Sequence, residues 1–438
     1  MLFTRLPEKK YILGIDLEET FCQISYLNTR KFSAGMDPHT FSYIAGREAF
    51  NIPSAAFCDE ETGKWAFGKE ALDLAAERGK EPLTRLLALA AREETSGEED
   101  AEPGRKGGGE GEAHFYGDLL TAYLKYCLTL LSVEVTAEET EAVTFTTADM
   151  DKANAAVLRR AAQELYPGLE KVAFEEHLKS FYHYVLMQDE EQRRESVLLV
   201  DGWSGAEPVL SCLSFNKKTR PIVCFPEQRK LEFPEDADAG GKDQILYDAV
   251  WELMQEKAFS AAYLTGELLA GGWMKESLNL ICRGRRAFQG DNLYSKGAAY
   301  STLIACGMAA KADKYFYLST DALRCNIGMA CLKKGRMVYQ ALLDAGSVWY
   351  DAASQIDILL EDGDEITLIQ TPVDQGNTRE ITVKLENMPQ RPRAATRLRI
   401  KLSMRAVDLL RIEVEDMGFG EIFPSSGMRW EQEIAING

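Results

Sequence analysis

Long hydrophobic runs, paired cysteines and histidines are all scarce in this sequence. No stretch of its 438 residues approaches the ~20 apolar residues that a helix needs to cross a bilayer. The nine cysteines are scattered without a CxxC pair, which argues against a zinc site or a disulfide framework. With four histidines and no GxSxG motif, nucleophilic hydrolase chemistry has little support. The first residues lack a signal peptide's apolar stretch, so we expect a cytoplasmic protein with no membrane partner.

Positive charge is also in deficit. Lysine and arginine total 50 against 69 aspartates and glutamates, a formal net charge of -19. Nucleic acids and anionic membranes attract proteins with a positive field, so neither is expected as a partner. We interpret the basic clusters at 283–286 and 391–401 as solvated faces.

The length predicts two or three domains, and the texture of the chain changes once. In the first part, apolar runs that predict buried strands alternate with helical patterns, which is typical of an α/β fold. The runs are 11–15, 143–145, 196–200 and 261–265, and the helices are 152–166 and 244–257. No internal repeat is apparent. Residues 94–113 are rich in Glu and Gly without large apolar side chains, which predicts a disordered loop.

Beyond about residue 320 the apolar residues alternate at period two, as in 381–386, 397–404 and 410–416. Such alternation predicts strands with one buried face, hence a sandwich-like β domain. We therefore expect a first domain over 1–312, a linker over 313–325 and a β domain over 326–438. The YFYL run at 315–318 is either an ordinary strand or a hydrophobic interdomain linker.

Two segments are similar to the phosphate-binding hairpins of actin-like ATPases. GIDLEETFCQISY (14–26) contains Asp16 and Thr20, and VLLVDGWSGAEPVLSCL (197–213) contains Asp201 and a turn from Gly202 to Gly205. In such hairpins the turns bring backbone N–H groups to phosphate oxygens, and the carboxylates act through a magnesium ion. A strand that ends in Asp and a turn is common by itself. The two together, in this order, are more specific.

Further segments fall in the same order as in the DnaK-type (70-kDa heat-shock) chaperones. IPSAAFCDEETGKWAFGKEA (52–71) resembles that family's TPSxVAF…xxGxxA stretch, and FEEHLKSFYHYVL (174–186) resembles its EPTAAALAYG helix. YLTGE (263–267) resembles the adenosine loop, and residues 385–420 resemble part of the substrate domain. The likeness covers most of residues 10–420, thinly but collinearly.

This resemblance implies a fold and a site. The fold would be a two-lobed actin-like α/β domain lacking one peripheral subdomain, since only a helix and a turn fit between Gly241 and Tyr263, followed by an all-β, sandwich-like domain. ATP or ADP and magnesium would be the cofactors. The implied catalytic residues are Asp16, Glu175 and Asp201; the nucleotide-binding residues are Thr20, Gly202, Gly205 and Gly266; Asp16 and Asp201 would hold the magnesium through water.

Several positions depart from the family pattern. In the first turn Glu18 replaces a glycine and Glu19 a threonine that touches phosphate. Each carboxylate would repel a triphosphate by roughly 1–4 kcal/mol per charge pair at ~4 Å. Trp203 lies in the second turn, where backbone should meet phosphate, and neither Lys80 nor Arg85 aligns clearly with the catalytic lysine.

These departures favour a chaperone-like pseudo-ATPase that works by binding a protein or peptide partner. An active ATPase, in which Mg-ATP gates the β domain, is the alternative. A sugar-kinase-like enzyme is disfavoured by the β-rich C-terminal part. The chain stops soon after its last strands, so we expect no helical lid. His177 and His183 are interpreted as ordinary core or surface histidines, not as a metal pair.

Overall fold

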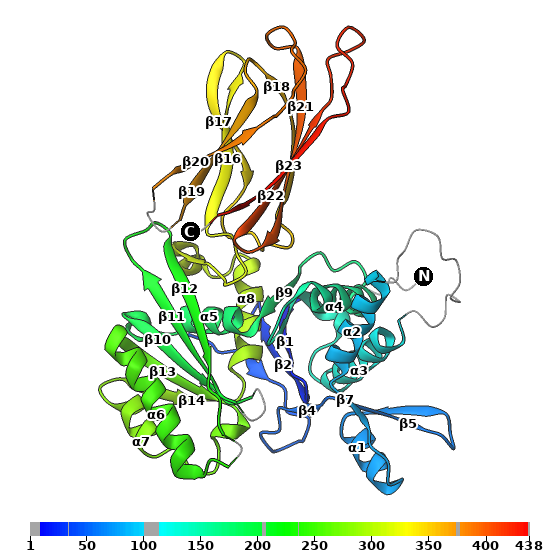
Figure 1. Ribbon diagram of the computed structural model, residues 1–438. Helices are drawn as coiled ribbons and strands as arrows, with labels where there is room; N and C mark the ends of the chain where they lie inside the picture. Colours follow the sequence, from blue (N-terminus) through cyan, green and yellow to red (C-terminus); the bar gives the residue numbers. More distant parts are fainter. Residues whose placement is uncertain are drawn as a thin grey trace. The chain divides into compact units, whose positions relative to one another are not determined.

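The computed structural model describes residues 9–33, 35–99, 114–203, 207–234, 236–373 and 377–436. It divides into two compact units, Met1–Phe316 and Tyr317–Gly438 (Figure 1). The first is mixed α/β and the second is strand-rich, as the sequence predicts. The predicted linker 313–325 contains the end of η4 (Ala310–Lys314) and β15 (Tyr315–Tyr317), so the YFYL run begins as a short strand. In the parts of the chain that are described, no helix combines the length and apolarity needed to cross a membrane.

The first unit contains two six-stranded sheets with the same core order of strands. The first sheet runs β3-β2-β1-β8-β9, with β4 also paired to β2; its strands are β1 (Tyr11–Leu17), β2 (Phe21–Asn28), β3 (His39–Thr40), β4 (Ile52–Pro53), β8 (Thr140–Thr147) and β9 (Val172–Glu176). The second runs β14-β13-β10-β11-β12-β15; its further strands are β10 (Ser196–Asp201), β11 (Val209–Asn216), β12 (Ile222–Lys230), β13 (Phe259–Thr265) and β14 (Arg286–Gln289).

In each sheet an antiparallel hairpin, β1–β2 or β10–β11, is followed by two parallel strands, β8 and β9 or β13 and β14. The architecture is therefore repeated, although the sequence shows no repeat. The central strands are buried on both faces, so a wide choice of Val, Ile, Leu and Ala satisfies each position and sequence identity need not persist.

Two helices pack closely in the first unit, α5 (His177–Met187) and α8 (Leu293–Ala305), and α8 also contacts β1, β2 and β8. The close approach depends on Gly297, because a Cβ there would lie 2.0 Å from the carbonyl oxygen of Ser180. The other helices are α1 (Gly68–Glu77), α2 (Leu86–Glu99), α3 (Phe115–Leu131), α4 (Lys152–Leu165), α6 (Ala239–Glu256), α7 (Glu276–Cys282), η1 (Ala137–Glu139), η2 (Glu190–Arg193) and η3 (Glu267–Leu269).

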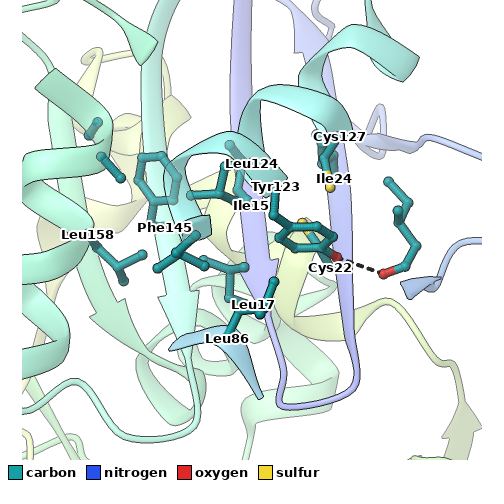
Figure 2. Packing of buried hydrophobic residues seen from close by; sticks show 14 of the residues in the cluster. Ile15, Leu17, Cys22, Ile24, Leu86, Tyr123, Leu124, Cys127, Phe145 and Leu158 are labelled. Carbon is teal, nitrogen blue, oxygen red and sulfur yellow. Dashed lines mark hydrogen bonds between the residues drawn. The ribbon is translucent and has the colours of Figure 1, made fainter. Parts of the chain in front are cut away.

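Figure 2 shows how apolar side chains from the first hairpin meet those of the helices. Ile15 and Ile24 pack with Tyr123 of α3, whose hydroxyl donates to the carbonyl of Ile52 over 2.9 Å. Leu86, just after the small sheet β5 (Ala55–Asp59), β6 (Lys64–Phe67) and β7 (Leu83–Thr84), joins the same core. This packing fixes the first hairpin, and with it the position of Asp16.

The predicted disordered segment 94–113 begins inside α2, which continues to Glu99. The Thr95 and Ser96 hydroxyls donate to the carbonyls of Ala91 and Arg92, so these polar residues satisfy their hydrogen bonds within the helix. Residues 100–113 lie outside the described residues.

The second unit consists of two four-stranded sheets, β17-β16-β19-β20 and β18-β21-β22-β23. Their strands are β16 (Cys325–Lys333), β17 (Arg336–Leu343), β18 (Ala353–Leu360), β19 (Glu365–Pro372), β20 (Arg379–Lys384), β21 (Thr396–Ala406), β22 (Leu409–Asp416) and β23 (Arg429–Ala435). Leu398, Ile400 and Leu402 of β21 are buried in one core with side chains of both sheets, as the period-two pattern predicts.

Candidate functional site

The aspartates of the two hairpins lie on either side of a stacked pair of rings. Asp16, near the end of β1, contacts His177, the first residue of α5, with 2.6 Å between Oδ1 and Nε2. The His177 ring stacks on Tyr294 of α8, with 4.0 Å between centroids and 8° between planes. The Tyr294 hydroxyl donates to Oδ2 of Asp201, the last residue of β10. The structure thus brings Asp16 and Asp201 to one cluster, as the sequence predicts, but with His177 and Tyr294 between them.

His177 is a buried cation. Burial by itself would lower its pKa, but the carboxylates of Asp16 and Glu18 raise the pKa of His177 from 6.5 to about 9. Its second nitrogen, Nδ1, lies 3.4 Å from Oε1 of Glu18. With both nitrogens protonated the ring donates from Nε2 to Asp16 and pairs through Nδ1 with Glu18, and 6% of its side chain is exposed. The positive charge beside Asp16 is therefore supplied by a side chain of the protein itself.

Burial raises the pKa of two acidic side chains near this imidazolium, Glu18 and Asp201. Burial raises the pKa of Glu18 from 4.5 to about 7, although His177 opposes the shift. Burial also raises the pKa of Asp201, against the hydrogen bonds from Tyr294 and from the backbone N–H of Trp203, which lies 2.8 Å from Oδ1. Each carboxylate depends on a donor supplied by a neighbouring side chain or turn.

The second predicted phosphate turn packs against the predicted adenosine loop. The N–H of Gly202 donates to the carbonyl of Thr265 over 2.8 Å, and Nε1 of Trp203 donates to the Thr265 hydroxyl over 2.9 Å. Gly266 has φ +104, and a Cβ there would lie 2.3 Å from the carbonyl carbon of Gly202. The Trp203 indole also packs against the Phe21 ring in a T-shaped arrangement, with 4.8 Å between the ring centroids. In the described part of this turn, the backbone amides of Gly202 and Trp203 are thus bonded within the protein.

Gly205 lies outside the described residues, and Thr20 lies exposed in the first turn, where its carbonyl accepts from the N–H of Ser54. Beside Thr20, Oε2 of Glu19 lies 3.1 Å from Nε of Arg85. Lys80 pairs with Glu60 instead, at 2.6 Å. Of the two basic residues considered for a catalytic role, only Arg85 therefore reaches this turn, and it contacts a carboxylate there.

Glu175, the third predicted catalytic residue, lies in a different buried cluster. Its carboxylate accepts from the hydroxyls of Ser180 at 2.6 Å and Ser301 at 2.9 Å, and lies 3.4 Å from Nδ1 of His183. Burial would raise the pKa of Glu175, but His183 and Lys179 outweigh it and the pKa is lowered. None of its hydrogen bonds within the described residues reaches Asp16 or Asp201. Glu175 joins β9 to α5 and α8.

The residues present do not fit a magnesium ion. Among the described residues, no group of three or more His, Cys, Asp or Glu side chains is arranged to hold a metal. The imidazolium of His177 directly contacts Asp16, the carboxylate that would act through the ion's waters. His177 is a core histidine, 5% exposed, which is one of the two interpretations that the sequence favoured, but its contact with Asp16 was not predicted. No sequence motif marks this contact.

Comparisons with known proteins find two families whose function is unknown. Residues 37–320 match the model of a family of unknown function (DUF5716), C-terminal part, and residues 322–436 match a domain of unknown function (DUF8552). No curated protein matches the chain. Among solved structures, a non-polymerising mutant of MamK bound to AMPPNP is similar at 12% identity and a TM-score of 0.36, over 68% of this chain and 99% of that one.

Proposed function

This chain belongs to the DUF5716 family of unknown function, and we propose that it is an actin-like, chaperone-like pseudo-ATPase. In this proposal the cleft of the first unit is closed by its own side chains and neither binds nor hydrolyses ATP appreciably. The second unit binds an extended segment of a protein partner. The single observation that carries the proposal is the position of His177 between Asp16 and Glu18.

Phosphoryl transfer depends on a metal ion and on donors aimed at the phosphates. Here the imidazolium of His177 already neutralises Asp16, and the Tyr294 hydroxyl already donates to one oxygen of Asp201. A nucleotide with magnesium would have to displace His177 from its buried ion pair. Removing one partner from such a pair costs about 3–5 kcal/mol, comparable to the whole binding energy of a weak ligand.

The topology supports the actin-like part of the proposal. Two sheets share one order of strands, and each has a hairpin whose first strand carries an aspartate, Asp16 or Asp201, at or next to its end. This is the arrangement that the sequence resemblance implies for a two-lobed nucleotide domain. The residues around the two aspartates differ from those of an active site, while the sheets that carry them keep the expected order of strands. This combination favours an inactive descendant of such a domain over an unrelated fold.

A groove in the second unit supports the partner-binding part. It has a volume of about 810 Å³ and is lined by side chains of β16, β17, β18 and β19. Leu332, Met337 and Leu359 are 61%, 68% and 52% exposed. Within the described residues, β17 and β18 are the edges of their sheets. Exposed apolar side chains beside a strand edge suit an extended apolar peptide, which can add backbone hydrogen bonds.

Charge refines the expected peptide. The groove is lined by four carboxylates and two basic side chains, namely Asp357, Glu361, Glu365, Glu380, Lys333 and Arg397. Asp357 and Glu361 are already paired with Arg399 and Arg393, so Glu365 and Glu380 are the carboxylates that favour a peptide whose apolar stretch is flanked by basic residues.

The test of the first part is calorimetric titration of the intact protein with ATP and ADP, with and without magnesium. We expect no heat and no thermal stabilisation at millimolar nucleotide. Nucleotide binding with a Kd below about 100 µM corresponds to a binding free energy of more than about 5 kcal/mol. Such binding would overturn the proposal if it required magnesium and disappeared in Asp201→Asn. That outcome would establish the active, nucleotide-gated alternative.

The test of the second part is fluorescence anisotropy with a dye-labelled heptapeptide of leucine and valine that has arginine at each end. Met337→Asp should weaken binding about tenfold, because it places a charge against apolar side chains. Ile422→Asp is the matched control, since Ile422 is 83% exposed and is not among the groove residues. Equal affinities for the two variants would reject the groove as the binding site.

A further inference from the structure

Arg285, just before β14, is a partly buried arginine with no carboxylate beside it. Its Nε is buried without a hydrogen-bond partner, and its Nη1 lies 3.3 Å from the sulfur of Met254, a weak acceptor. Burial lowers the pKa of Arg285 below its usual value, with no carboxylate to oppose the shift. The guanidinium therefore lacks the acceptor that a buried cation needs.

Other arginines of the chain show the usual arrangement. Hydrogen bonds that they donate to carboxylates raise the pKa of Arg78, Arg391, Arg399 and Arg411. Arg391 and Arg399 each make two such bonds to one aspartate. Arg160 Nη2 and Arg411 Nε are also buried without a hydrogen bond, but Arg160 lies 3.0 Å from Glu94 and Arg411 lies 2.6 Å from Glu431, so what distinguishes Arg285 is the lack of a neighbouring carboxylate.

Arg285 lines a cavity of about 450 Å³ at the start of β10, β13 and β14. Arg194 and Arg286 line it too, with Ser260, Glu191 and Glu195. Arg286 lies 3.5 Å from Glu191, but both side chains are exposed, at 60% and 82%, so this pair is weak. Three guanidinium groups against two carboxylates leave one positive charge in the cavity.

We propose that this cavity binds a phosphate group. The planar guanidinium groups of Arg285, Arg194 and Arg286 line the same cavity and suit one oxyanion, and Arg285 has no carboxylate that would compete with it. The one positive charge left in the cavity favours the binding of a small anion such as phosphate. The site is separate from the cleft of Asp16 and Asp201 and does not rest on the proposed function. The phosphate group can be free or carried on a phosphorylated side chain.

The experiment is calorimetric titration of the intact chain with potassium phosphate, against potassium chloride at matched ionic strength. We expect a Kd in the millimolar range or tighter, and a weakening of about tenfold or more in Arg285→Gln. Arg283→Gln is the matched control, because Arg283 is an exposed neighbour that does not line the cavity. Its affinity should equal that of the unmodified protein.

A second variant, Arg194→Gln, keeps the proposal testable if Arg285→Gln does not fold, since Arg194 is exposed. It should also weaken phosphate binding. No phosphate binding at about 10 mM, or equal binding by the Arg194 and Arg283 variants, would overturn the proposal. A phosphoserine peptide that binds tenfold tighter than phosphate would identify a phosphoprotein as the source. Equal affinity would identify free phosphate. Binding that survives Arg285→Gln unchanged would reject the site.

Discussion

His177 donates from Nε2 to Asp16 over 2.6 Å while its ring lies flat on Tyr294, 4.0 Å between centroids. The Tyr294 hydroxyl in turn donates to Asp201. Two hydrogen bonds and one ring stack therefore connect the two aspartates. The helices α5 and α8 supply the rings, and the sheets supply the carboxylates. The site is thus held together by contacts that the tertiary fold makes.

The first prediction concerns pH and His177. Its pKa in the folded protein is about 9 against 6.5 for a free side chain, so the folded state holds its proton more tightly. The resulting stability is fully present below pH 6.5 and is lost as the pH rises through 9, with a slope of at most about 1.4 kcal/mol per pH unit for one proton. Calorimetric unfolding between pH 6 and 9.5 should show the midpoint falling over this range.

His177→Gln should be less stable near neutral pH and should lack this part of the slope. His39→Gln is the control, because His39 is exposed and makes a ring contact with Tyr26. Glu18, with a pKa raised from 4.5 to about 7, adds a decline of the same sign between those values. Identical pH profiles for the protein and His177→Gln would show that His177 is not a cation.

The second prediction compares two tyrosines of α8. Tyr294→Phe removes the hydroxyl that donates to the half-buried Asp201, and should lower the free energy of unfolding by about 2 kcal/mol, as for a hydrogen bond to a charged group. Tyr300→Phe removes a similar bond, 2.5 Å to Oδ1 of Asp37, but Asp37 is exposed and water can replace the donor. Its loss should be under about 1 kcal/mol.

Denaturant unfolding of both variants, followed by intrinsic fluorescence, measures the difference. If Tyr294→Phe cost no more than Tyr300→Phe, the pairing of Tyr294 with Asp201 would not be needed to hold the cleft.

The third prediction concerns the contact between the two turns. Gly266→Ala combines a left-handed backbone with a Cβ only 2.5 Å from the nitrogen of Trp203, so one turn must move. We expect a loss of more than about 3 kcal/mol in the free energy of unfolding. Gly271→Ala is matched in φ, at +92, with open space around its Cβ, and should cost only about 1–2 kcal/mol from the backbone. Thermal unfolding distinguishes the two.

The sequence predicted what depends on local pattern. Buried runs and period-two alternation located β1, β8, β10, β13, β21 and β22, because burial of a strand leaves its mark on consecutive residues. The two hairpins could likewise be identified from a strand, an aspartate and a turn. Asp16 and Asp201 were therefore expected in one site, and the structure brings them to one cluster.

The partners of those aspartates could not be predicted in the same way. His177 is 161 residues from Asp16, and Tyr294 is 93 residues from Asp201, so each contact arises only when α5 and α8 pack on the sheets. The effect of Glu19 was predicted as repulsion of phosphate, and its actual neighbour, Arg85, depends on the same packing. Long-range polar contacts have no periodicity that a single sequence reveals.

The last prediction concerns acid stability of the second unit. Asp416 is fully buried and bonded twice to Arg391, at 2.7 and 2.6 Å, and it also accepts from the N–H groups of Ser426 and Gly418. The hydrogen bonds from Arg391 hold the pKa of Asp416 well below 3.8. This stability is present above pH 3.8 and is lost as the pH falls through the folded-state pKa.

Arg391→Met should therefore lower the free energy of unfolding near pH 7 by about 3 kcal/mol, because it leaves a buried carboxylate without its cation. Arg399→Met is matched in geometry, since Arg399 makes two bonds of 2.8 and 3.1 Å to Asp357. Those two side chains are 30% and 37% exposed, so we expect a loss under about 1 kcal/mol. Chemical unfolding at pH 7 and pH 4 tests both. The loss caused by Arg391→Met should be smaller at pH 4, as Asp416 in the unfolded chain becomes protonated. Equal losses for the two variants at pH 7 would mean that burial does not decide how much these ion pairs contribute to the free energy of unfolding.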